Sequence, residues 1–143
     1  MNMTLGRESG TIIVTGGAGF IGSAVVRELL ANTDCCVVNV DCLTYAGNLA
    51  TLSDIAESKN YIFEQMNICD AHSVRRLFQK HNPTGVIHLA AESHVDRSID
   101  SADDFVQTNI IGTYTLLEAV RAHHLEQGRS GGSGCRFLHV STD

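Results

Sequence analysis

Thr11-Ile-Ile-Val-Thr-Gly-Gly-Ala-Gly-Phe-Ile-Gly22 is the stretch that decides the fold of this 143-residue chain. Its β-branched beginning, Thr11 to Thr15, is typical of a buried parallel strand. Glycines follow at positions 16, 19 and 22, and residues 23–30 then carry apolar side chains at helical spacing. A strand, a glycine-rich turn and a helix in this order form the context in which a dinucleotide-binding fingerprint is found.

Each of the three glycines has a physical role in such a turn. Gly16 allows the chain to turn sharply off the strand, Gly19 allows the backbone to approach a pyrophosphate, and Gly22 allows the helix to lie close to the strand. The N–H groups of the first helical turn then face the phosphates, aided by the helix dipole. The spacing is G-x-x-G-x-x-G, one residue longer than the commoner G-x-G-x-x-G.

An acidic residue closes the second apolar run, Cys36 to Val40. Asp41 follows Gly22 by 19 residues, close to the distance at which an acid accepts hydrogen bonds from the adenosine ribose and repels a 2′-phosphate. The sequence therefore favours NAD over NADP as the cofactor. The alternative is an ordinary strand–turn–helix unit followed by an incidental acid.

The composition is that of one globular domain, with 43% apolar and 18% charged residues. The formal net charge of −6 argues against nucleic acid or an anionic membrane surface as the main partner. No apolar run reaches membrane-spanning length, and residues 1–10 are expected to be a flexible N-terminus rather than a secretory signal. Five cysteines without a C-x-x-C pair predict free thiols in a cytoplasmic protein, and no metal site is expected.

Strand and helix patterns alternate along the whole chain, which predicts an α/β fold with a Rossmann-type, doubly wound parallel sheet. We expect strands at 11–15, 36–40, 61–66, 85–89 and 135–140, helices at 20–31, 48–56, 71–81 and 103–126, and a flexible loop at 127–134. Right-handed crossovers predict the strand order 3-2-1-4-5, with the sheet truncated after the fifth strand. His88 and His139 are expected to be hydrogen-bonded core residues, and the long helix is expected to bury Phe105, Val106, Ile110, Leu116, Leu117 and Val120.

Ligands of such sheets bind beyond the carboxyl ends of the strands. The segments that come after the five predicted strands are also the most distinctive parts of the sequence. They include Asp41-Cys-Leu-Thr-Tyr-Ala-Gly-Asn48, Leu89-Ala-Ala-Glu-Ser-His-Val-Asp-Arg-Ser98 and Ser141-Thr-Asp143, together with the helical motif Thr108-Asn-Ile-Ile-Gly-Thr113.

With these motifs the chain, from residue 11 to residue 143, resembles the dTDP-glucose 4,6-dehydratases, a family of the extended short-chain dehydrogenase/reductase superfamily. The glycine motif marks only the superfamily. The motifs at 89–98 and 141–143 are more specific, because related epimerases and decarboxylases look different there. The resemblance implies a homodimeric NAD-dependent lyase of nucleotide-sugar biosynthesis. Such an enzyme converts dTDP-glucose to dTDP-4-keto-6-deoxyglucose through an internal hydride cycle.

The resemblance also implies roles for individual residues. Ser93 and Thr142 would bind the substrate, and Asp143 would be the general acid that protonates the departing C6 hydroxyl. Where the family usually has Asp and Lys, this chain has Asn67 and Cys42. The cofactor-binding residues would be Gly16, Gly19, Phe20, Ile21, Gly22, Asp41, Cys42, Leu43, Thr44, Asn67, Ile68, Leu89, Ala90, Ala91 and Thr108.

Some groups that the resemblance implies are not found in these 143 residues. The family's glutamate base would come directly after Asp143, and its Tyr-x-x-x-Lys pair would come later. Tyr45, Tyr61 and Tyr114 are each followed four positions on by a residue other than lysine. We therefore expect residues 11–143 to be the cofactor-binding half, inactive alone and without the substrate domain. A related epimerase or decarboxylase, a non-catalytic NAD-binding module and a uridine carrier in place of thymidine remain alternatives.

Overall fold

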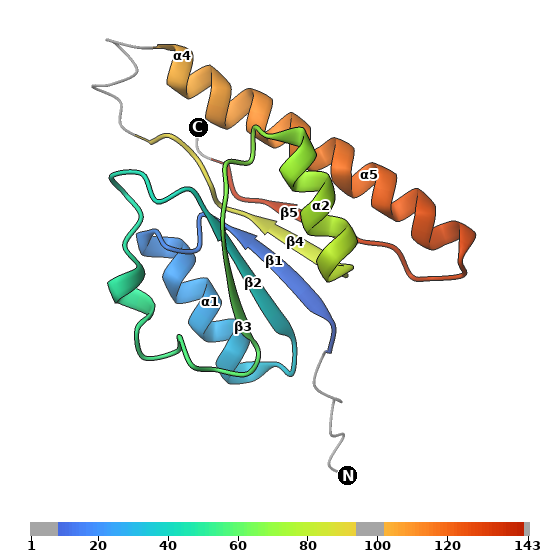
Figure 1. The fold of residues 1–143 in the computed structure, drawn as a ribbon, viewed down its shortest axis with the longest axis horizontal. Coiled ribbons are helices and arrows are strands. Elements are labelled where there is room, and N and C mark those ends of the chain that lie inside the picture. Colours follow the sequence, from blue (N-terminus) through green and yellow to red (C-terminus); the bar gives the residue numbers. More distant parts are fainter. Residues whose placement is uncertain (1–8, 94–101, 142–143) are drawn as a thin grey trace.

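The computed structural model describes residues 9–93 and 102–141. The chain forms a parallel five-stranded sheet in the order β3-β2-β1-β4-β5, with helices on both faces (Figure 1). The strands are β1 (Thr11–Thr15), β2 (Cys36–Asp41), β3 (Tyr61–Gln65), β4 (Gly85–His88) and β5 (Arg136–His139). The predicted fold class and strand order are therefore confirmed.

Two apolar layers hold the helices to the sheet. Helix α1 (Phe20–Asn32) and the 3₁₀-helix η1 (Leu49–Leu52) cover one face, whose core contains Val14, Val26, Val37 and Leu52. Helices α2 (Ala71–His81) and α5 (Thr113–Arg129) cover the other face (Figure 1). The core beneath them is larger and includes Ile13, Val38, Val40, Val74, Leu77, Phe78, Val86, Leu116 and Val120. Successive residues of β1 and β2 thus point to opposite layers, as a buried parallel sheet requires.

The ends of α2 agree with the sequence signals. Asp70 caps the helix, because its Oδ1 accepts hydrogen bonds from the backbone N–H groups of His72 at 3.0 Å and Ser73 at 3.2 Å. Asn82 ends it in the left-handed conformation, with φ 44°, and Pro83 is the next residue. By contrast, the helix expected over 48–56 is a single 3₁₀ turn that Asn48 caps.

The helix expected over 103–126 has three parts: α4 (Ala102–Phe105), the π-helix η2 (Val106–Gly112) and α5. Leu116 and Val120 are buried as predicted, whereas Phe105, Val106, Ile110 and Leu117 are 37%, 42%, 59% and 45% exposed. The prediction for these four side chains is wrong for a geometric reason. Val106 and Ile110 lie in η2, whose wide turns change which side chains face the sheet. Phe105 lies in α4, which extends beyond the strands (Figure 1). Leu117 lies outside the buried face of α5, which includes Leu116 and Val120.

The two strand histidines differ in their surroundings. His88, on β4 between β1 and β5, is 1% exposed and hydrogen-bonded, as expected. His139 is exposed, so the prediction that it is a core residue is wrong. The reason is its strand, because β5 pairs with β4 on one side and no strand among the described residues covers its other edge.

Three further observations concern the cysteines, the length and polarity of the helices, and the grouping of potential metal ligands. All five cysteines are free thiols; Cys35 and Cys135 are buried and Cys42 is exposed. In the described ranges, 9–93 and 102–141, the helices are too short or too polar to cross a membrane. Within the same ranges no cluster of three potential metal ligands occurs.

Candidate functional site

The glycine turn after β1 is closed against the protein on one side and open on the other. A Cβ on Gly22 would lie 2.0 Å from the carbonyl oxygen of Gly16, so the helix approaches the turn as closely as backbone atoms allow. Gly16 has φ +72°, and a Cβ there would lie 2.8 Å from the amide nitrogen of Ala90. A Cβ on Gly19 would meet only the Gly16 carbonyl oxygen, at 3.3 Å. The positive φ of Gly16 and the close contact at Gly22 agree with the sharp turn and the close helix approach predicted for these two glycines, and the approach of a pyrophosphate at Gly19 stays a prediction.

The first turn of α1 presents backbone donors at this open side. Gly19 is the N-cap residue, and no side chain in the described part of the chain caps the helix there. Phe20 and Ile21 point outward, 95% and 62% exposed. The first N–H groups of a helix have no partner within the helix, and the dipole gives this end a partial positive charge. The turn therefore suits an anionic group such as a pyrophosphate.

The carboxylate of Asp41, the last residue of β2, is held against the same turn. Its Oδ2 accepts a hydrogen bond from the Ala18 N–H at 3.0 Å, and its Oδ1 accepts one from the Leu43 N–H at 2.8 Å. Leu43 adopts φ 55°, which bends the chain back toward the carboxylate. Because each carboxylate oxygen has two lone pairs, one on each oxygen is still available for a hydroxyl. The negative charge disfavours a phosphate at this place.

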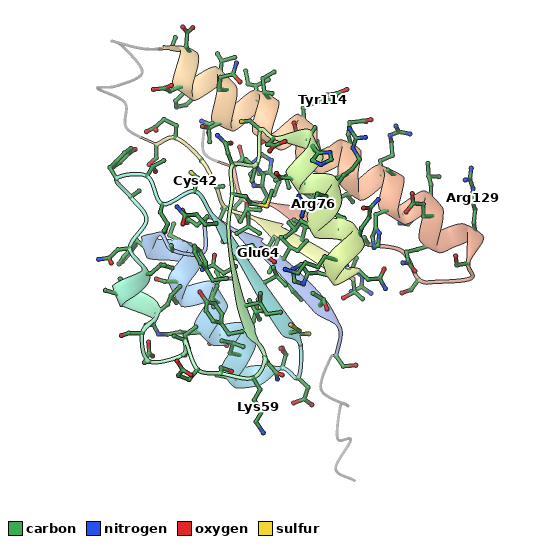
Figure 2. All side chains as sticks on the ribbon, viewed as in Figure 1. Cys42, Lys59, Glu64, Arg76, Tyr114 and Arg129 are labelled. Carbon is green, nitrogen blue, oxygen red and sulfur yellow. The ribbon has the colours of Figure 1, made fainter. Side chains whose placement is uncertain are left out.

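The segment after β3 contains two of the predicted site residues, Asn67 and Ile68. Asn67 is exposed, and its Oδ1 accepts a hydrogen bond from the Cys69 N–H at 2.9 Å, so part of its acceptor capacity is used locally. Ile68 is buried, and a Cβ on Gly112 of η2 would lie 2.6 Å from its Cδ1. This close contact places the π-helix directly against the segment. Cys42, just beyond the end of β2, is exposed (Figure 2).

The segment after β4, residues 89–93, begins against the glycine turn, because a Cβ on Gly16 would lie 2.8 Å from the amide nitrogen of Ala90. We call this segment the floor of the site. The amides of Leu89 and Ala90 both donate to the hydroxyl oxygen of Thr15, each at 3.2 Å. Ala91 and Ser93 are exposed, as is Thr44 in the loop after β2, whereas Thr108 is half-buried in η2. Thr142 and Asp143, expected to bind substrate and donate a proton, lie outside the described residues.

Two further residues of the site were not among those predicted. Asn109 of η2 clamps the backbone of Glu92: its Oδ1 accepts from the Glu92 N–H at 2.8 Å, and its Nδ2 donates to the Glu92 carbonyl at 3.0 Å. The hydroxyl of Tyr45 donates to the Glu92 carboxylate, which joins the loops after β2 and β4. Both residues lie in motifs that mark the sequence as distinctive. Their roles depend on the π turn and on loop packing, which sequence spacing does not reveal.

Replacing Asn109 with alanine is expected to lower the free energy of unfolding by ~2 kcal/mol, because the N–H and C=O of Glu92 would lose their partners in a half-buried place. Urea denaturation measures this change. The control is Gln107→Ala in the same helical segment, where the side chain is exposed and the backbone carbonyl, which the substitution keeps, bonds to Cys69. Its expected effect is within ~0.5 kcal/mol. Equal midpoints for Asn109→Ala and the unchanged chain would contradict the clamp.

A parallel sheet with a glycine turn, an uncapped helix N-terminus and an acid at the end of the second strand defines a Rossmann-type dinucleotide-binding fold. The chain belongs to the GDP-mannose 4,6 dehydratase family, whose model matches residues 13–143. Over 132 residues it is 57% identical to a dTDP-glucose 4,6-dehydratase of Neisseria meningitidis, covering 92% of this chain and 37% of that protein.

Solved structures give the same picture. A dTDP-glucose 4,6-dehydratase of Bacillus anthracis in complex with NAD superposes with a TM-score of 0.77 and 34% identity, over 93% of this chain and 37% of the other. A UDP-glucose 4-epimerase of Thermotoga maritima with UDP-glucose superposes with a TM-score of 0.76 and 36% identity, over 92% of this chain and 38% of the other. The chain thus spans little more than a third of the length of the relatives it matches.

Proposed function

We propose that this chain is the NAD-binding part of a dTDP-glucose 4,6-dehydratase. The observation that carries the proposal is the Asp41 carboxylate, held by the Ala18 and Leu43 amides beside a glycine turn whose outer side is open. This arrangement suits two ribose hydroxyls and a pyrophosphate, and it disfavours a 2′-phosphate. Curated relatives that are 50% to 57% identical to this chain carry the name dTDP-glucose 4,6-dehydratase, which supports the dehydratase over the epimerase alternative.

When bound, NAD supplies the acceptor and donor of a hydride. The residues of this chain would bind and orient it. The N–H groups of Phe20, Ile21 and Gly22 would hold the pyrophosphate, and Asp41 would hold the adenosine ribose. The neighbouring loops and η2 would supply the remaining contacts: Cys42, Leu43 and Thr44 at the rim, Asn67 and Ile68 beside the adenine, Leu89, Ala90 and Ala91 beneath the cofactor, and Thr108.

On the substrate side, Ser93 and Thr142 would bind a sugar nucleotide, dTDP-glucose, and Asp143 would act as the general acid. This part of the proposal rests on family resemblance. On the same ground we propose that the parent enzyme is a homodimer located in the cytoplasm. A general base is worth ~10²–10⁴-fold in rate, and no Tyr-x-x-x-Lys pair occurs in these 143 residues. The polypeptide is therefore proposed to bind NAD without turning over dTDP-glucose.

Isothermal titration calorimetry on the 143-residue chain tests the proposal. We expect one NAD per chain and an affinity for NADP at least ~10-fold weaker, because the 2′-phosphate would meet the Asp41 carboxylate. An assay for the 4-keto product from dTDP-glucose is expected to match a control without protein. A folded chain that binds neither dinucleotide would contradict the cofactor assignment, and product above the control would contradict the proposed inactivity.

A further inference from the structure

His88 is buried at the end of β4, where it joins the site floor to the long helix. Its Nδ1 lies 2.6 Å from the hydroxyl of Thr15 on β1, and its Nε2 lies 2.9 Å from the hydroxyl of Thr113 on α5. The same Thr15 oxygen accepts hydrogen bonds from the amides of Leu89 and Ala90. One imidazole thus connects three elements that surround the loop after β4.

These contacts decide where the proton of the ring sits. A threonine hydroxyl has one hydrogen and two lone pairs. The Ala90 amide donates to Thr15 Oγ1 at 3.2 Å, and the Leu89 amide shares its hydrogen between Oγ1 at 3.2 Å and the backbone carbonyl of Thr15 at 3.1 Å. With these two donors at its lone pairs, the hydrogen of the Thr15 hydroxyl points to Nδ1 of His88, 2.6 Å away. That nitrogen is therefore the acceptor, and the proton of the neutral ring is on Nε2, which donates to Thr113. A second proton on Nδ1 would compete with these amides for the lone pairs of Thr15 Oγ1, and the Leu89 amide would be left with its bond to the Thr15 carbonyl alone.

The surroundings of the ring keep it neutral. Burial, and next the neighbouring imidazole of His139, lower the pKa of His88 to about 4. The two rings are stacked with their centroids 4.9 Å apart, and Phe137 lies on the same side at 6.0 Å. The ring is hydrogen-bonded to the hydroxyls of Thr15 on β1 and Thr113 on α5, and the titratable group that acts on its charge is His139 of β5.

We propose that His88 is a positioning residue for the cofactor site: its neutral ring, with the proton on Nε2, orients the Thr15 hydroxyl so that its oxygen accepts from the backbone N–H groups of Leu89 and Ala90. The functional part of this proposal rests on the proposed NAD site, because those two residues form the floor under the cofactor. The ring itself would touch neither cofactor nor substrate. Its effect on binding would pass through Thr15 alone.

Two variants separate this positioning role from a merely structural one. In His88→Asn the side-chain oxygen falls near the place of Nδ1, so it can accept from Thr15 but not be protonated at neutral or mildly acidic pH. In His88→Gln the polar atoms lie one bond further, near the place of Nε2, and Thr15 loses its acceptor. Both variants should unfold at a lower temperature than the unchanged chain. We expect NAD affinity to stay within ~3-fold for asparagine and to fall ~10-fold for glutamine, as one lost hydrogen bond implies.

Nuclear magnetic resonance on the 15.4 kDa chain gives a readout that does not depend on NAD. At neutral pH the ¹⁵N shifts of His88 should show an unprotonated Nδ1 and a protonated Nε2. The amide resonances of Leu89 and Ala90 should titrate together with the ring near pH 4 in the unchanged chain and not in His88→Asn. His72→Gln, at an exposed histidine on α2, is the control and should leave this titration unchanged.

Stability should depend on the same proton with a defined sign. An unfolded histidine titrates near pH ~6.5, and folded His88 near 4, so between these values the unfolded chain binds more protons. The contribution of His88 to stability is therefore full above pH ~6.5 and declines as the pH falls toward 4. His88→Asn should lose this part of the pH dependence.

Three results would overturn the proposal: a proton on Nδ1 at neutral pH, loop amides that do not titrate with the ring, or a folded His88→Gln chain that binds NAD as tightly as the unchanged one. If the unchanged chain binds no NAD, the proposed cofactor site fails, while the resonance titration still decides whether His88 positions the loop. If His88→Gln does not fold, the ¹⁵N shifts and amide titration of the unchanged chain decide it.

Discussion

Replacing Gly22 with alanine is expected to abolish detectable NAD binding and to lower the free energy of unfolding by ~3 kcal/mol, at the upper end of the usual cost of overpacking. The new Cβ would lie 2.0 Å from the Gly16 carbonyl oxygen and 2.7 Å from the Cα of Gly17. Both obstacles are backbone atoms, so no side chain can rotate away to make room. Helix α1 and the glycine turn would have to separate, and the helix N-terminus would move away from the phosphates.

Calorimetry with NAD and urea denaturation measure the two parts of this prediction. The matched control is Gly128→Ala in α5, where an added Cβ meets no described atom within 4 Å. Alanine is a better helix former than glycine, so this control should gain stability by up to ~1 kcal/mol and keep NAD affinity. If Gly22→Ala binds NAD like the control, the close approach of helix and turn does not matter for binding.

Replacing Asp41 with asparagine is expected to weaken NAD binding ~10- to 100-fold, because hydrogen bonds to a charged group contribute ~1.5–3 kcal/mol. An amide has one acceptor atom, whereas the Asp41 carboxylate accepts from both Ala18 and Leu43. One of these two amides would lose its partner, and the ribose would lose a charged acceptor. Affinity for NADP should change less, because the same substitution removes the charge that repels the 2′-phosphate. The preference for NAD over NADP should therefore shrink.

The control for this prediction is Asp54→Asn. Asp54 is an exposed carboxylate paired with Arg27 at 2.7 Å, away from the glycine turn. An exposed ion pair contributes ~0–1 kcal/mol, so the control should keep NAD affinity and lose little stability. Calorimetric titration of both dinucleotides into both variants gives the comparison. An unchanged ratio of the two affinities in Asp41→Asn would show that the carboxylate does not select the cofactor.

The sheet could be predicted from the sequence because its signals are local and mutually consistent. β-branched runs mark β1 and β2, the glycine turn requires a helix directly after β1, and the right-handed crossover rule then leaves few strand orders. The cap of α2 at Asp70 and its end at Asn82 depend on the same kind of local chemistry. The position of Asp41 can be predicted because a carboxylate at the end of the second strand lies beside the glycine turn in such a sheet, and its hydrogen bond from Ala18 agrees with that position.

The burial of side chains on the long helix could be predicted only in part from local sequence spacing. A period of 3.6 residues predicts that Val106 and Ile110 face the sheet, but η2 has π geometry, so these side chains point elsewhere. The role of Asn109 depends on the same turn, since only the packed structure brings its amide to the backbone of Glu92. The prediction of a buried His139 is wrong because the residues of a strand do not indicate whether the strand lies at the edge of the sheet, as β5 does among the described strands. Neighbours distant in sequence decide all three cases.

The strand order also implies the sequence in which parts of the sheet can fold as the chain leaves the ribosome. β1 pairs with β2, so the layer made by β1, α1, β2 and β3 can form from the first residues synthesised, whereas β4 and β5 dock later on the other side of β1. Gly16 lies at this seam, against Ala90. An early folding intermediate would therefore contain the glycine turn and Asp41 before residues 89–93 pack against the turn. Dinucleotide capture should accordingly be one of the last events of folding rather than an aid to its beginning.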